Sequence, residues 1–341
     1  MTELSKRKEK YKLPPLLIKG FKFFNSITGE NVIIKGVDYY PRPNSGELNH
    51  NSIDFFTAKY RHIWERDIPN FLDLGINAIR IYSVDPSQDH SDFMCALNAA
   101  NIYVMVELAS QDCAILKTQA PSCYPNSLKI RGQAIIQEFS RYNNTLAFSA
   151  GNEVNHYVPS GEGPEWNAPC LKKFIQDMRA YVQKCTMMRN IPIGLTSADT
   201  DRDVNALYYN CLSEPDKGDL DRAEFYGINS YVVCNGTVTT YDEAPGFQLL
   251  VSSFENLNYS IPVMLTEYGC LSQTYPTIDG YEGQRTFHES EWFGLPEVRD
   301  TFTGGFAFEY SIEAGNAHTP YPYKVFGHQN YGVGKMTLTE C

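Results

Sequence analysis

In the stretch LAFSAGNEV (146–154), a short apolar run is followed by an amide, Asn152, and a carboxylate, Glu153. The stretch PVMLTEYGC (262–270) has the same plan, with Glu267 in the corresponding place. Such runs are typical of buried parallel strands, and polar residues that follow them are typical of the carboxyl edge of a sheet. Two strands that each deliver a carboxylate to one edge predict a functional site there.

Similar apolar or β-branched runs alternate with segments of helical period along the chain. This alternation predicts βαβ units and a parallel sheet. The predicted strands cover residues 33–39, 78–84, 102–108, 146–150, 193–196, 225–231, 263–267 and 305–310. The predicted helices cover residues 63–74, 92–100, 128–142 and 171–187.

Eight strands with intervening helices predict one α/β (β/α)8 TIM barrel, since no linker or composition break divides the chain into two domains. The alternative is an open sheet. We expect a hairpin of residues 21–24 with 32–35 before the barrel, turned at Ser26–Gly29. The last helix is expected to be short or missing. Residues 1–15 are expected to be a basic, polar, disordered segment, and 16–341 a single catalytic domain.

The charge balance excludes some partners. The chain has 341 residues, with 29 Lys and Arg against 40 Asp and Glu and a net charge of -11. Binding to nucleic acid requires an excess of cations, so no nucleic-acid partner is expected. No apolar run is long enough to span a bilayer. Because no secretory leader or anchor tail is visible, we expect either a cytosolic protein or part of a longer precursor. No feature indicates an oligomer.

Cysteines and glycosylation triplets favour the secreted alternative. Acceptor triplets for N-glycosylation begin at Asn143, Asn235 and Asn258. The nine cysteines include no C-x-x-C spacing, and no His pair accompanies them, so we expect no metal. Some of these cysteines are expected to form disulfides, and the odd total leaves at least one thiol unpaired.

The two strand-end carboxylates, Glu153 and Glu267, form a candidate catalytic pair. Strands four and seven lie on opposite sides of an eight-stranded ring, so their side chains can meet above its axis. Two carboxyl groups about 5 Å apart can perform double displacement at a sugar carbon, one as nucleophile and one as acid/base. The alternative is that both are solvated loop residues. No G-x-S-x-G or H-E-x-x-H motif offers another nucleophile or a zinc site.

These residues resemble the fungal glycoside hydrolase family 72, the β-1,3-glucanosyltransferases of the cell wall. The matched stretches are IIKGVDYY (33–40), RDIPNFLDLGINAIRIYSVDPSQDH (66–90), ALNAANIYV (96–104), AGNEV (150–154), FYGINSY (225–231) and TEYGC (266–270). The resemblance implies that Glu153 is the acid/base and Glu267 the nucleophile. It implies that Asn152 binds the sugar hydroxyl at carbon 2, and that Arg80 and Tyr231 hold the nucleophile.

The resemblance also implies a set of glucan contacts. The expected substrate-binding residues are Tyr39, Tyr82, Glu107, Asn152, Asp199, Arg202, Tyr231, Phe308 and Tyr310. Some positions depart from the family pattern. Glu107 replaces an aspartate, Tyr40 a glutamine and Phe308 a tyrosine, for which Tyr310 is expected to compensate on the same strand face. The loop at 110–126 differs as well, so a remodelled acceptor region is expected.

The same resemblance implies a pattern of disulfides. Cys234 and Cys270 match a family pair, and Cys211 matches half of another bridge, for which Cys341 is a candidate partner. Trp64 and Phe93 stand where the family has the cysteine pair that joins the first two helices, so that disulfide is lost at both ends.

The implied activity is that of a retaining β-1,3-glucanosyltransferase. It cleaves a β-1,3-glucan chain through a glycosyl-enzyme on Glu267 and transfers it to a second β-1,3-glucan acceptor, without a cofactor. Two alternatives stay open: a retaining β-glucanase of the same clan, and a non-catalytic glucan-binding protein. The implied location is the cell surface or cell wall, with membrane attachment only through a GPI anchor outside this chain.

Overall fold

The computed structural model describes residues 13–42, 47, 50–212, 218–277 and 280–311. Within them, eight parallel strands close into a barrel in the order β12-β3-β4-β5-β6-β7-β8-β9. The predicted (β/α)8 barrel is confirmed, and the open-sheet alternative is wrong. The barrel strands are β3 (Ile34–Asp38), β4 (Ala78–Ile81), β5 (Tyr103–Glu107), β6 (Thr145–Asn152), β7 (Ile193–Ala198), β8 (Tyr226–Asn229), β9 (Val263–Tyr268) and β12 (Phe302–Ala307).

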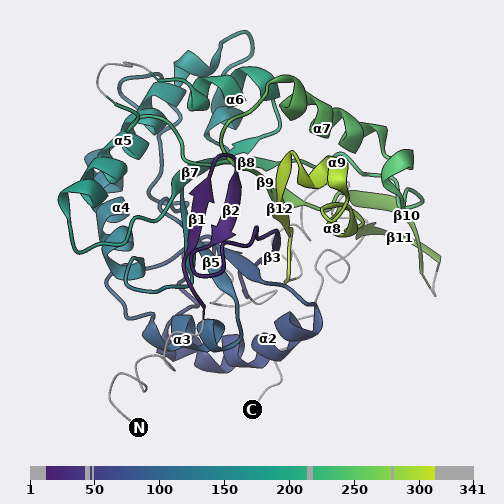
Figure 1. The fold of residues 1–341 in the computed structure, drawn as a ribbon, viewed down its shortest axis with the longest axis horizontal. Coiled ribbons are helices and arrows are strands. Elements are labelled where there is room, and N and C mark those ends of the chain that lie inside the picture. Colours follow the sequence, from purple (N-terminus) through teal and green to yellow (C-terminus); the bar gives the residue numbers. More distant parts are fainter. Residues whose placement is uncertain (1–12, 43–46, 48–49, 213–217, 278–279, 312–341) are drawn as a thin grey trace.

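Helices connect the barrel strands and form a ring around them (Figure 1). Each forms because apolar residues recur at helical spacing, as in α2, which buries Ile63, Trp64 and Phe71 on one face. The four predicted helices correspond to α2 to α5 with shifted ends, whereas α6 to α9 were not predicted. The helices are α2 (Arg61–Asp73), α3 (Ser91–Ala99), α4 (Asn126–Phe139), α5 (Ala168–Lys184), α6 (Arg202–Asn210), α7 (Pro245–Asn256), α8 (Glu289–Trp292) and α9 (Pro296–Arg299).

An N-terminal hairpin is present as expected, and one of its two strands overlaps the expected strand 21–24. β1 (Leu16–Lys19) pairs antiparallel with β2 (Lys22–Asn25). Gly20 makes the tight turn between them, with a φ of +60° that favours glycine. The expected pairing of 21–24 with 32–35 is found only next to the turn, where Phe24 forms an antiparallel bridge with Asn31 and the N–H of Val32 donates to the carbonyl oxygen of Phe23 at 2.9 Å. It does not continue, because residues 34–38 belong to barrel strand β3.

The hairpin covers the amino-terminal end of the barrel. Leu16 and Phe23 from the hairpin pack with Ile34, Ala78 and Phe225, which lie at or next to the starts of their strands. Figure 1 shows the purple hairpin across the middle of the ring of helices. This end is closed by apolar side chains, so the polar residues that follow the strands lie at the opposite, carboxyl end.

The ends of the chain are described only in part. Tyr103 Oη of β5 donates to the carbonyl oxygen of Pro14 at 2.7 Å, which joins this segment to the barrel. The backbone N–H of Ser26 donates to the carbonyl oxygen of Pro15 at 3.1 Å, which joins it to the turn after β2. Residues 1–12 lie outside the described residues. So does the chain after residue 311, where the last helix was expected.

A second, unpredicted hairpin follows the seventh barrel strand. It consists of β10 (Leu271–Thr277) and β11 (Gly280–Arg285) and extends to the right edge of Figure 1.

At the position of the family disulfide that this chain lacks, the buried Trp64 ring of α2 meets the Phe93 ring of α3 edge to face, with centroids 5.7 Å apart. An aromatic contact therefore joins the two helices at the place where the family disulfide is expected to be lost.

Candidate active site

The site is built around Arg80, a charged residue inside the otherwise apolar strand β4. Its guanidinium is fully buried. Nη1 lies 2.9 Å from Oε1 of Glu267 and 3.2 Å from Oδ1 of Asp38. Nη2 lies 2.8 Å from Oε1 of Glu107 and donates to Oδ1 of Asn152 at 2.7 Å. One cation on β4 thus connects polar residues at the ends of four other barrel strands, β3, β5, β6 and β9.

Glu267 lies in β9 and is only 7% exposed. Three donors hold its carboxylate. Arg80 Nη1 and the Tyr82 hydroxyl each donate to Oε1 at 2.9 Å, and the Tyr231 hydroxyl donates to Oε2 at 2.6 Å. Donors on both oxygens fix the orientation of the carboxylate. Arg80 and Tyr231 therefore contact Glu267 as expected, whereas Tyr82, expected to contact glucan, also binds this carboxylate.

Glu153 follows the last residue of β6 and has a different environment. Its Oε1 accepts a hydrogen bond of 2.9 Å from Asn229 Nδ2. The backbone of Glu153 is left-handed, with a φ of +52° that is uncommon for a residue with a side chain. Burial raises the pKa of the Glu153 carboxyl, and the negative charge of Glu267 raises it further. Glu153 therefore holds its proton to higher pH than an exposed glutamate.

Asn229, at the end of β8, was not predicted as a site residue. Its amide nitrogen also lies 3.3 Å from Oδ1 of Asn152, and its own Oδ1 accepts from the Thr266 hydroxyl at 2.9 Å. These contacts fix the amide that faces Glu153. The sequence signal was the same as for Asn152, because a polar amide ends an apolar strand run in both.

Two further acids lie beneath the pair. Glu107, expected to bind substrate, is 2% exposed and is held by Arg80. Asp38, not predicted, is fully buried at the end of β3. Burial raises the pKa of both carboxyls, that of Asp38 well above its ordinary value, although the positive charge of Arg80 opposes the shift. The two acids therefore retain protons more readily than exposed carboxyls do.

A cavity of about 710 Å³ opens beside Glu267. Its volume and its mixture of apolar and polar lining are typical of ligand sites. Loops after several barrel strands line it, and the expected site residues Tyr82, Glu107, Asn152, Glu267 and Phe308 contribute to it. The other lining residues include Tyr40, Arg42, Asn51, Ser110, Asp112, Ile115, Leu116, Lys117, Tyr157 and Glu309.

The structure does not bring Tyr39 or Tyr310 into this cavity. Tyr39 is fully buried, and its hydroxyl donates to Oδ2 of Asp67 at 2.8 Å. The hydroxyl of Tyr310 accepts from Asn70 Nδ2 at 2.9 Å, and its ring is also buried. The structure therefore places both side chains in the core and not at the cavity, and the hydroxyl of Tyr310 bonds to Asn70.

Asp199 and Arg202 form a pair of their own. Arg202 Nε and Nη2 each donate to one carboxylate oxygen of Asp199 at 2.8 Å, and Ser230 Oγ donates to Asp199 Oδ2 at 2.5 Å. Neither residue borders the cavity beside Glu267. Their expected glucan contacts stay predictions.

Arg285, at the end of β11, is a site neighbour that was not predicted. Its guanidinium lies 5.2 Å from the Tyr231 ring centre and 5.1 Å from that of Phe308. Its Nη1 donates to the carbonyl oxygen of Gly269 at 2.6 Å. Arg285 therefore supports the tyrosine that holds Glu267, through the hairpin whose presence the sequence did not indicate.

The cysteines are paired only partly as expected. Cys234 and Cys270 form the predicted disulfide between the loops after β8 and β9. Cys123 and Cys170 form a second disulfide that was not predicted. Cys211 is bonded to no cysteine among the described residues, and its candidate partner Cys341 lies outside them.

The described part of the chain offers no cluster of three or more His, Cys, Asp or Glu side chains suited to a metal ion. In the same part, no helix has the length and apolar character needed to cross a membrane. What the site does offer is one carboxylate, Glu267, with three hydrogen-bond donors, and one carboxyl, Glu153, whose pKa burial raises. Such a pair can combine nucleophilic attack with general acid catalysis.

Comparisons with known proteins agree with this arrangement. A family model described as glucanosyltransferase matches residues 5–319. The chain is 33% identical over 301 residues to 1,3-beta-glucanosyltransferase PGA4 of Candida albicans, covering 88% of this chain and 60% of the relative. It is 34% identical over 306 residues to 1,3-beta-glucanosyltransferase GAS5 of Saccharomyces cerevisiae, covering 89% of this chain and 57% of the relative.

Solved structures show the same likeness. Saccharomyces cerevisiae Gas2p in complex with laminaritriose and laminaritetraose matches with a TM-score of 0.73 and 29% identity, over 96% of this chain and 64% of that one. The chain thus spans about 60% of the length of the first curated relative that it matches.

Proposed function

This chain belongs to the glucanosyltransferase family, and we propose that it is a retaining β-1,3-glucanosyltransferase. Its substrates are a β-1,3-glucan donor and a β-1,3-glucan acceptor. Relatives of this chain carry the activity in their names, and the related Gas2p binds laminari-oligosaccharides. The observation that carries the proposal is the asymmetry between Glu267, whose carboxylate has three donors, and Glu153, which accepts one hydrogen bond from Asn229 and whose pKa is raised by burial.

The reaction takes place in two displacements at the anomeric carbon. In the first, an oxygen of Glu267 bonds to this carbon, the bond to the leaving oxygen breaks, and that oxygen takes the proton of Glu153. In the second, an acceptor hydroxyl gives its proton to Glu153 while its oxygen attacks the same carbon, and the bond to Glu267 breaks. Arg80 and Tyr231 stabilise the carboxylate before the first step and after the second.

Transfer rather than hydrolysis requires a bound acceptor, because positioning must make one sugar hydroxyl more effective than bulk water. A cavity of about 710 Å³ with several aromatic walls supports oligosaccharide binding beside Glu267. The second candidate is a β-glucanase of the same clan, in which water resolves the intermediate. The observation that favours this second candidate is Phe308, which lines the cavity and lacks the hydroxyl of the tyrosine in the family pattern.

The proposal is tested with a β-1,3-glucan oligosaccharide of one defined length. We expect products both longer and shorter than the substrate, with the anomeric configuration retained when products are followed by NMR. Shorter products alone would make the protein a hydrolase, and binding without products a glucan-binding protein. Glu267→Gln and Glu153→Gln serve as matched controls, each expected to lower turnover by more than about 100-fold.

The location is proposed on two grounds. The two disulfides suit an oxidising compartment outside the cytosol. The family resemblance places such proteins at the fungal cell surface. We therefore propose a cell-wall location, with membrane attachment only through segments outside this chain.

A further inference from the structure

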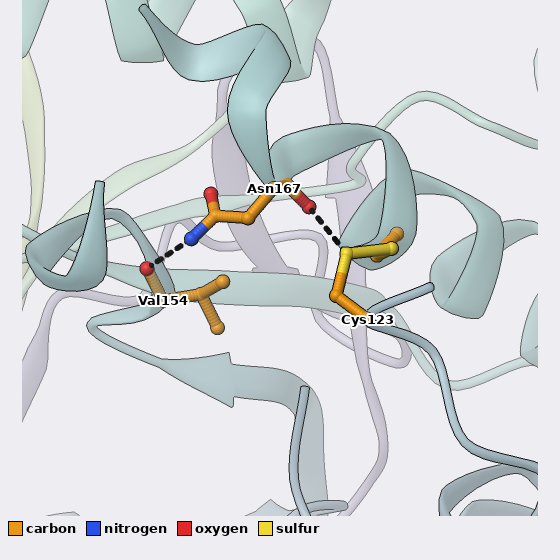
Figure 2. The surroundings of a disulfide bond; sticks show 4 residues. Cys123, Val154 and Asn167 are labelled. Carbon is orange, nitrogen blue, oxygen red and sulfur yellow. Dashed lines mark hydrogen bonds between the residues drawn. A yellow bond between two sulfur atoms is a disulfide. The ribbon is translucent and has the colours of Figure 1, made fainter. Parts of the chain in front are cut away.

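The unpredicted disulfide lies beside the turn that carries Glu153. Cys123 follows the loop after β5, and Cys170 lies in the first turn of α5. Between them is Asn167, whose carbonyl oxygen lies 3.9 Å from Cys123 Sγ (Figure 2). The side chain of Asn167 points away from the disulfide, and its Nδ2 donates to the carbonyl oxygen of Val154 at 2.7 Å. A chain of contacts therefore leads from the disulfide to the neighbour of Glu153.

The same disulfide holds one wall of the cavity. Residues 109–112 and 114–117 line the cavity, and the loop that contains them ends at Cys123. The backbone N–H of Leu116 donates to the carbonyl oxygen of Cys123 at 2.8 Å. The backbone N–H of Ala120 donates to the carbonyl oxygen of Trp166 at 2.7 Å. The loop is thus joined to the segment that contains Asn167 by a covalent bond and a backbone hydrogen bond.

The turn after β6 has two supports. On the β7 side, the N–H of Glu153 donates to Thr196 O at 2.8 Å, and Asn155 exchanges hydrogen bonds with the backbone of Ala198. On the other side, Asn167 holds Val154. Because the backbone of Glu153 is left-handed, its conformation depends on such supports.

We propose that Asn167 and the Cys123–Cys170 disulfide form a positioning unit, which fixes the carboxyl of Glu153 relative to the cavity wall at residues 109–117. This inference rests on the proposed function, since it assigns Glu153 as acid/base. General acid catalysis depends on placement of the donor within a fraction of an ångström of its target. Asn167 and both cysteines are at most 3% exposed, which suits a permanent support rather than a disulfide that is readily reduced.

Two variants test the unit. Asn167→Asp keeps the shape of the side chain but replaces the donating NH2 group with an acceptor that opposes the carbonyl oxygen of Val154. Cys123→Ser combined with Cys170→Ser removes the covalent link. Cys95→Ser is the matched control, because Cys95 is exposed on α3 and is not in a disulfide.

Activity is measured on two donors. One donor is a β-1,3-glucan oligosaccharide, whose leaving oxygen needs a proton. The other is a nitrophenyl glycoside of a β-1,3-glucan oligosaccharide, whose nitrophenolate leaving group needs little protonation. We expect kcat/KM on the oligosaccharide to fall at least about 10-fold in both variants, and that on the aryl donor by less than about 3-fold. Equal loss on the two donors, or no loss, would overturn the proposal. The control keeps both activities.

Hydrogen exchange gives a second measurement that needs no activity. We expect faster amide exchange at both 109–117 and 153–158 in each variant, and unchanged exchange in Cys95→Ser. Unchanged exchange at 153–158 would overturn the positioning unit even if the wild type is active. If the wild type acts on neither donor while the exchange changes as expected, the proposed function fails and the coupling stands. If the double variant does not fold, Asn167→Asp carries the same expectations.

Discussion

Nη1 of Arg80 lies 2.9 Å from Oε1 of Glu267, and this nitrogen faces three other oxygens at 2.9 to 3.2 Å. It carries only two hydrogens, so it cannot donate to all four. Glu267 has two additional donors, the hydroxyls of Tyr82 and Tyr231, whereas Asp38 has Arg80 at 3.2 Å and the Tyr82 hydroxyl. The negative charge of the site is therefore best stabilised on Glu267, where a nucleophile needs it.

Tyr231→Phe removes the donor to Oε2 of Glu267 while leaving the ring. A hydrogen bond to a charged group contributes about 1.5–3 kcal/mol, so we expect kcat/KM for glucan transfer to fall about 10- to 150-fold. The measurement is initial-rate kinetics with an oligosaccharide of defined length. Tyr181→Phe on α5 is the control and should keep wild-type kinetics. A loss below about 3-fold would show that this hydrogen bond does not support the nucleophile.

The pH dependence should report Glu153. The protonated form is the active one, and burial raises its pKa above that of an exposed glutamate, about 4.3. Activity is therefore present below this raised pKa and is lost as the pH rises through it. We expect the alkaline limb of kcat/KM to lie at higher pH than the pKa of an exposed glutamate, and expect it to disappear in Glu153→Gln assayed on an aryl donor. A limb that persists in Glu153→Gln would assign it to another group.

The barrel and its catalytic edge could be predicted because eight apolar runs each meet local rules, without reference to distant contacts. The hairpin could not. The turn at Ser26–Gly29 does form, with the N–H of Gly29 bonded to Asn25 O at 2.9 Å, but the tighter turn at Gly20 decides the strand pairing. Strand β1 could not be predicted because Pro14 and Pro15 directly precede it, and prolines next to an apolar run indicate a loop.

The site residues show where the pattern of alternation ends. Tyr39 and Tyr40 both follow the end of β3, and the structure places Tyr40 at the cavity and Tyr39 in the core. Tyr310 was expected to share the face of Phe308, but β12 ends at Ala307, and alternation does not continue beyond a strand. The Cys123–Cys170 disulfide joins a loop to a helix 47 residues away, which sequence spacing does not reveal.

Trp64 should contribute strongly to stability. Its side chain is 1% exposed, its ring packs against Phe93, and its Nε1 donates to Thr57 O at 3.1 Å. Trp64→Ala is expected to lower the free energy of unfolding by about 3–5 kcal/mol. Urea denaturation measures this. A double-mutant cycle with Phe93→Ala should give a coupling of about 0.5–1.5 kcal/mol, and zero coupling would mean that the ring contact does not replace the lost disulfide energetically.

Asp38 should be a neutral carboxylic acid in the folded protein. Its pKa is raised well above the ordinary value, first by complete burial and then by the charge of Glu267, against the opposing effect of Arg80. Glu309 adds a further negative charge in the same direction, and the Tyr82 hydroxyl opposes it. In the unfolded chain, Asp38 loses its proton near pH 4. Between this pH and the raised pKa of the folded state, the folded protein binds more protons at this residue than the unfolded chain does.

Asp38→Asn tests this difference, because asparagine imitates the protonated acid. Wild-type stability should fall with rising pH at this residue, by up to about 1.4 kcal/mol per pH unit between the two pKa values, whereas the variant lacks this loss. The unfolding free energy of the variant minus that of the wild type should therefore increase in urea titrations as the pH rises above the ordinary pKa of an aspartate, about 3.9. The exposed Asp73→Asn on α2 should show no such trend. A stability difference between variant and wild type that does not change with pH would contradict this prediction and would mean that Asp38 is ionised in the folded protein.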